Sequence, residues 1–230
     1  MKCLFFPLLI LFALQADAQR QDLNTLSEDE RRAIVKEALS DLKDGKATLI
    51  VRLPSNHKKM RELKRLADSD KLSPQKSAQM QEMLAATASI TPAFNGRLMT
   101  AFEENYDFSP VLFMLDTASV SLKNGVRRGI FLDKNIENNP DIKLTTDKYY
   151  LLAVDYEGFP KAMNIVDYDM LNAAAEKLPR PFPQDARASF WLNFSLIFSG
   201  DSAEKQKKAM TKMTAKYNKK LTKAYERFIK

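Results

Sequence analysis

The chain has 230 residues, a formal net charge of +7, one histidine (His57) and one cysteine (Cys3). A chain of this length can bury a core without disulfide or metal staples. The scarcity of cysteine and histidine argues against thiol catalysis, a cysteine-based zinc site and a Ser-His-Asp triad. We therefore predict no metal and no cofactor.

Residues 1–18 have the pattern of a cleavable secretory signal peptide. Lys2 supplies a positive charge, an apolar run covers residues 3–14, and Ala16-Asp17-Ala18 places small residues where signal peptidase reads them. The run has 12 residues, whereas a membrane-spanning helix needs roughly 20. Its position at the extreme N-terminus argues against a buried core helix. We expect cleavage after Ala18, a cysteine-free mature chain that begins at Gln19, and export to the periplasm or the medium.

The positive charge of the mature chain lies at its C-terminal end. Residues 200–230 hold ten Lys or Arg and three Asp or Glu, whereas residues 19–199 hold 25 of each. Because the body of the chain is neutral and exported, we predict no nucleic-acid partner.

Local patterns predict an N-terminal helix followed by a strand. Ser27 and Glu30 form a capping box before a helix over 28–43, and Gly45 suits its C-terminal cap. The β-branched, apolar run over 47–53 predicts a central strand.

Helices predicted over 57–105 connect this strand to a second one over 110–116. Ser55 can cap their start, and Thr91-Pro92 predicts an interruption. A strand, a helical crossover and a second strand favour a parallel pair.

The second half of the chain predicts further strands and a long final helix. Tyr149–Val154 and Ala162–Val166, separated by a Gly-Phe-Pro turn, predict a hairpin. The sequence also predicts strands over 129–132 and 190–199, a short helix over 170–177 and an amphipathic basic helix over 201–230. We predict one α/β domain over 19–230, with a mixed sheet of five or six strands flanked by helices.

Part of the sequence resembles a known protein family. The block GIFLDKNIENNPDIKLTTDKYYLLAVDYEG, preceded by ENYDFSPVLFML and followed by LPRPFP, resembles a family of uncharacterised exported proteins of Gram-negative bacteria. The resemblance covers about residues 45–230 and implies export and this fold, with no activity. Ser109 stands where that family has a cysteine, so a thiol role is not implied here.

The turn after the first strand is one candidate site, for an anion. Ligands of α/β sheets bind at the carboxyl ends of parallel strands, and helix N-termini favour anions. The alternative is an ordinary capped helix with solvated lysines, since no glycine allows a phosphate to approach the backbone. The candidate residues are Arg52, Ser55, Asn56, His57, Lys58 and Lys59.

Five aspartates near predicted strand ends form a second candidate site. Carboxylates gathered at one edge can bind a cation or act as an acid–base pair, whereas isolated aspartates at turns are structural. The five are Asp116, Asp133, Asp155, Asp167 and Asp169.

The basic helix over 201–230 is a third candidate, for contact with an anionic membrane surface or a partner. The alternative, which we favour, is that its apolar stripe packs on the sheet. Overall, the sequence predicts a non-enzymatic binding or interaction module with an unknown partner, either an anionic ligand or a protein. A carboxylate-dependent hydrolase, with or without a metal, is the alternative function.

Overall fold

The computed structural model describes residues 25–157, 164–183 and 203–230. The predicted signal peptide and the strand predicted over 190–199 lie outside the described residues. The elements in chain order are α2 (Glu28–Lys43), β1 (Ala47–Leu53), α3 (His57–Ala67), α4 (Pro74–Asn105), β2 (Val111–Leu115), the 3₁₀ turn η1 (Asp116–Ala118), α5 (Ser119–Lys123), β3 (Lys148–Glu157), β4 (Asn164–Leu171) and α7 (Ala203–Phe228).

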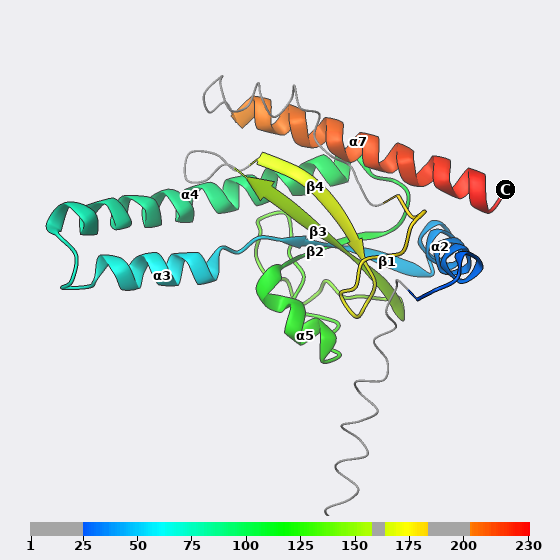
Figure 1. Ribbon diagram of the computed structural model, residues 1–230, viewed down its shortest axis with the longest axis horizontal. Helices are drawn as coiled ribbons and strands as arrows, with labels where there is room; N and C mark the ends of the chain where they lie inside the picture. Colours follow the sequence, from blue (N-terminus) through cyan, green and yellow to red (C-terminus); the bar gives the residue numbers. More distant parts are fainter. Residues whose placement is uncertain (1–24, 158–163, 184–202) are drawn as a thin grey trace, which may run out of the picture.

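The strands form a mixed sheet with the order β2-β1-β3-β4 (Figure 1). β1 is parallel to both of its neighbours, with Val51 opposite Phe113 on β2 and Leu152 on β3. β3 and β4 are antiparallel. The predicted α/β class, the central position of the first strand, its parallel pairing with the second and the hairpin are therefore confirmed.

Four strands form this sheet within the described residues, so the predicted number of five or six is not confirmed. The strand predicted over 129–132 is wrong: this segment makes one isolated bridge, Leu132 to Asn138, and a second bridge, Arg128 to Lys143, lies just before it. Gly129 has a φ of +72°, which is incompatible with extended backbone. The Leu132 N–H still bonds to the Phe113 carbonyl of β2, so the segment covers part of that edge.

The helix predicted over 170–177 is also wrong, because β4 continues to Leu171 and a tight turn follows. The Asn172 side chain accepts hydrogen bonds from the N–H groups of Ala174 (3.0 Å) and Glu176 (2.9 Å). An asparagine that bonds to the backbone ahead of it stabilises a turn in place of a helix.

Helix α2 begins as the sequence predicts. The Ser27 hydroxyl accepts the Glu30 N–H, and the Glu30 carboxylate accepts the Ser27 N–H at 2.8 Å. Gly45, with a φ of +70°, follows the end of the helix and adopts the left-handed conformation that glycine allows there.

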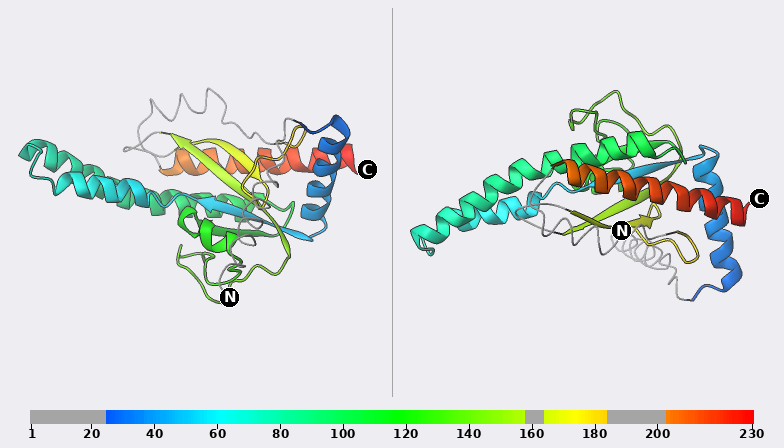
Figure 2. Two further views of the ribbon diagram at one scale, coloured as in Figure 1. Left: turned by 60° about the horizontal axis from the view of Figure 1, so that its bottom comes forward. Right: turned by 90° about the horizontal axis from the view of Figure 1, so that it is seen from above.

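Helices α3 and α4 pack side by side, and the views of Figure 2 show them projecting beyond the sheet. The predicted interruption at Thr91-Pro92 is wrong, because α4 is continuous over 32 residues with Pro92 inside it. Pro92 is exposed, so its ring meets solvent, and α3 and α7 pack on α4. Tertiary packing therefore maintains a helix that proline alone disfavours.

Two apolar clusters cover the two faces of the sheet. Alternate residues of β1, including Leu49 and Val51, pack with α2, α4 and α7. Ile50 lies on the other face, in a cluster with α5 and the segment that follows it. Helix α7 lies along α4 and contacts α2 and β4 (Figure 1), so the long C-terminal amphipathic helix is confirmed as part of the packed body.

Candidate functional site

The residues of the predicted anion site lie at the carboxyl end of β1, but two of them are engaged in internal hydrogen bonds. Asn56 has a φ of 53°, donates to the Thr91 hydroxyl (2.9 Å) and accepts from the Tyr156 hydroxyl (2.9 Å). Ser55 accepts the His57 N–H at 3.3 Å. The polar side chains of this turn thus join β1 to α4 and β3.

A carboxylate of the chain itself also lies at this turn. Asp116, at the end of β2, accepts the Ser55 N–H at 3.1 Å. Burial lowers the pKa of Lys59, while His57 and Lys58 are exposed and Arg52 is half-buried. The turn therefore resembles the structural alternative, a connection fixed by its own side chains, more than a preformed anion site.

Three of the five candidate aspartates, Asp116, Asp133 and Asp169, lie in separate environments. Asp133 accepts the N–H groups of Asn135 (2.8 Å) and Glu137 (3.2 Å) in a loop. Asp169 forms an ion pair with Lys177 at 2.7 Å.

Two of the aspartates do face each other. Asp155 and Asp167 are direct partners in the β3–β4 register. Within the described residues no group of three or more Asp, Glu, His or Cys is arranged to hold a metal. For the hydrolase alternative, the described residues therefore provide one pair of facing carboxylates, Asp155 and Asp167, and no larger carboxylate cluster.

Helix α7 buries the stripe that its sequence predicts. Met213 is 3 % exposed, and Tyr217 and Leu221 are fully buried. Most of its lysines are exposed on the other side. None of the helices in the described part of the chain is long and apolar enough to cross a membrane.

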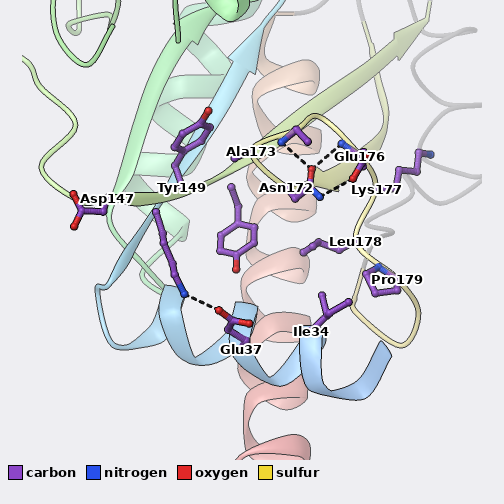
Figure 3. A pocket seen from close by; sticks show the side chains of 13 residues that line it. Ile34, Glu37, Asp147, Tyr149, Asn172, Ala173, Glu176, Lys177, Leu178 and Pro179 are labelled. Carbon is purple, nitrogen blue, oxygen red and sulfur yellow. Dashed lines mark hydrogen bonds and ion pairs between the residues drawn. The ribbon is translucent and has the colours of Figure 1, made fainter. Parts of the chain in front are cut away.

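A cavity lies beside the start of β3, at the opposite end of that strand from the predicted anion site, and Figure 3 shows the side chains that line it. It has a volume of about 450 Å³, within the usual range of small-molecule sites. Helix α2, the start of β3 and the turn after β4 form its walls. The lining residues are Ile34, Glu37, Asp147, Lys148, Tyr149, Tyr150, Asn172, Ala173, Ala174, Glu176, Lys177, Leu178 and Pro179.

The walls of this pocket are fixed by hydrogen bonds and ion pairs. The Lys148 ammonium contacts Glu37 at 2.6 Å and Asp41 at 2.7 Å, which joins β3 to α2. Asn172 holds the opposite turn and also donates to the Glu176 carboxylate at 3.1 Å (Figure 3). A site with walls fixed in this way loses little conformational entropy when it binds a ligand.

The pocket lining carries a small excess of negative charge. Its two lysines are both in ion pairs, Lys148 with Glu37 and Asp41 and Lys177 with Asp169. Hydrogen bonds to Asp41 and Glu37 raise the pKa of the Lys148 ammonium, so it stays charged. The lining itself holds three carboxylates, those of Glu37, Asp147 and Glu176, and two ammonium groups, so its formal net charge is −1. Asp41 and Asp169 pair with the two lysines from outside the lining.

Tyr150 supplies an aromatic wall with a neutral hydroxyl. Burial, followed by the charges of Asp41 and Glu37, raises the pKa of Tyr150 to about 12. The phenol therefore stays protonated at neutral pH and offers a hydrogen-bond donor.

The sequence did not predict this pocket, because its parts are distant in the chain. Lys148 is separated by 107 residues from Asp41, and no local pattern connects them. Asn172 was the one available signal, since asparagine favours turns.

The chain was compared with known proteins. No family model, curated protein or solved structure matches it. The resemblance to exported Gram-negative proteins remains a prediction.

Proposed function

We propose that the chain is exported and that its mature part is a non-enzymatic binding module, with the pocket between α2, β3 and the turn after β4 as its ligand site. The observation that carries this proposal is the composition of the lining: carboxylates, lysines held in ion pairs, tyrosines, one asparagine and apolar side chains, without a serine, threonine, cysteine or histidine. Many covalent catalysts use a serine, threonine or cysteine activated by a neighbouring base such as histidine, and this lining offers no such pair.

The ligand class follows from charge and shape. Because carboxylates outnumber the paired lysines, a positively charged group is favoured in the pocket. Ile34, Tyr150 and Leu178 provide an apolar surface for the rest of the ligand. We infer that the ligand is an amine, or a basic side chain of a partner, attached to an apolar body.

Two probes of similar shape and opposite charge test this inference. Phenethylamine should bind and shift the NMR signals of Tyr150 and Leu178, whereas phenylpropionate should not, because the carboxylates repel it. An Asp147→Asn/Glu176→Gln variant should bind the amine about tenfold more weakly, the cost expected for losing a charge-assisted contact. Glutamine at 176 keeps an oxygen that can accept from Asn172.

A matched control removes two negative charges from a surface outside the pocket. Glu103 and Glu104 are exposed on α4 and do not line the pocket, so Glu103→Gln/Glu104→Gln should bind the amine as the parent does. Equal binding of both probes, or equal weakening in both double variants, would reject the pocket as an amine site.

A further inference from the structure

A second cavity, of about 340 Å³, lies where the start of α2 meets the end of α7 and the segment at 180–181. Its lining differs from that of the first pocket, because arginine dominates it. The lining residues are Glu28, Arg31, Arg32, Arg180, Pro181, Arg227 and Phe228. Four guanidinium groups from three separate parts of the chain thus share one cavity with a single carboxylate.

That carboxylate neutralises only one of the four arginines. Glu28 is paired with Arg32 at 2.6 Å. The Arg31 Nε–H, and not a terminal nitrogen, donates to the Leu26 carbonyl at 3.1 Å. Arg227 lies over the Phe228 ring, 5.4 Å from the centroid. Among the described residues, no ion pair with a carboxylate involves Arg31, Arg180 or Arg227.

The basic side chains that line this cavity are all arginines, and none is a lysine. Residues 200–230 contain nine lysines and a single arginine, Arg227, and that arginine is the one basic side chain of the segment that lines the cavity. Arginine stays charged at every relevant pH, and its planar fork binds phosphate oxygens in pairs, which lysine does not do. Most lysines of α7 are exposed on the surface of the helix, whereas the four arginines line one concave basic surface.

We propose that this arginine cavity, defined by Arg31, Arg32, Arg180 and Arg227, binds a phosphate compound that carries two or more negative charges. The lining charge favours a multiply charged anion over a monovalent one. Phe228 and Pro181 provide an apolar contact for the body of the ligand. This site is distinct from the amine pocket in residues and in charge, so either can fail without the other.

Calorimetric titration of the mature chain with pyrophosphate at low ionic strength tests the site. We expect saturable binding that weakens with added salt. An Arg180→Gln/Arg227→Gln variant should bind about tenfold or more weakly, because each arginine contributes charge-assisted hydrogen bonds. Both side chains are exposed, so the fold should persist; Arg180→Gln alone serves as a second variant if thermal melting shows that the double variant is unfolded.

The control separates a specific site from general attraction to a basic helix. Lys207 and Lys208 are exposed near the start of α7 and are absent from the cavity lining. A Lys207→Gln/Lys208→Gln variant has the same net charge as the arginine variant and should bind pyrophosphate like the parent. If both variants lose affinity equally, the proposal is overturned.

A vesicle sedimentation experiment tests whether the bound phosphate belongs to a lipid headgroup or to a soluble compound. The chain is sedimented with phosphatidylcholine vesicles, with and without cardiolipin, whose headgroup carries two phosphates. Arginine-dependent pelleting with cardiolipin, without heat from pyrophosphate, would assign the phosphate to a lipid headgroup. Arginine-dependent heat from pyrophosphate would assign it to a soluble compound, and the absence of both signals would overturn the site.

Discussion

Two buried tyrosines at the contact between β4 and α7 have different hydrogen bonding. Tyr168 and Tyr217 are both fully buried, and their ring centroids lie 5.6 Å apart. The Tyr168 hydroxyl lies 3.1 Å from the Thr214 hydroxyl. The Tyr217 hydroxyl has no hydrogen-bond partner among the described residues. The same chemical group is therefore satisfied at one position and costly at the other.

Phenylalanine substitution at each position should have different effects on stability. Tyr168→Phe should lower the free energy of unfolding by about 1 kcal/mol, because it removes a hydrogen bond and leaves Thr214 without that partner. Tyr217→Phe should leave it unchanged or raise it by up to about 1 kcal/mol, since it removes a buried group that lacks a partner. Urea unfolding of both variants measures the difference, and an equal loss in the two would contradict the assignment.

Helix α4 is continuous although one of its interior residues, Pro92, locally disfavours a helix. Its first turn contains Pro74, where the missing N–H is unused and the fixed φ suits a helix. Pro92 lies in the interior of the same helix, where it removes a hydrogen bond to the Ala88 carbonyl. The Thr87 and Thr91 hydroxyls donate to the carbonyls of Met83 (2.7 Å) and Thr87 (2.9 Å) just before it.

Alanine substitution at positions 74 and 92 should show that proline is tolerated in the first turn of α4 and costly in its interior. Pro92→Ala should raise the free energy of unfolding by about 1–2 kcal/mol, because interior proline disfavours a helix by about 3 kcal/mol while it also restricts the unfolded chain. Pro74→Ala should be neutral or slightly destabilising. Both residues are exposed, which makes the pair a matched comparison by thermal or urea unfolding. A loss of stability in Pro92→Ala would mean that the fold requires proline there.

Sequence patterns predicted some elements correctly and others wrongly, and the difference depends on which residues fix the backbone. The capping box of α2 and the apolar stripe of α7 involve neighbours within one element, so the sequence predicted both. The segment at 129–132 and the turn after β4 were predicted wrongly, because Gly129 and the Asn172 side chain determine their backbone and apolar periodicity does not report this.

At the scale of the whole molecule, the export prediction has a direct test. Protein recovered from the periplasm or medium of an expressing Gram-negative host should begin at Gln19, or at its pyroglutamate form. N-terminal sequencing or intact mass spectrometry measures this. An Ala18→Pro variant should accumulate uncleaved, because proline is not one of the small residues that signal peptidase reads there. Recovery of the parent with Met1 intact would contradict export by this signal.

Neither of the two cavities could be located from local pattern. The amine pocket depends on Lys148 reaching Glu37 and Asp41 on another element. The arginine cavity depends on Arg180 and Arg227 meeting the start of α2. Such contacts join residues far apart in the chain, so apolar periodicity and capping signals carry no information about them.

Periodicity and local capping were enough to predict the α/β class, the parallel pairing of the first two strands, the β3–β4 hairpin and the buried stripe of the final helix. The continuity of α4, the internal use of Ser55 and Asn56, the positions of the aspartates and those of both cavities followed from contacts made in the folded chain. These depend on which side chains the folded chain brings together, and the free energy of such contacts is set by packing and local charge across the whole molecule.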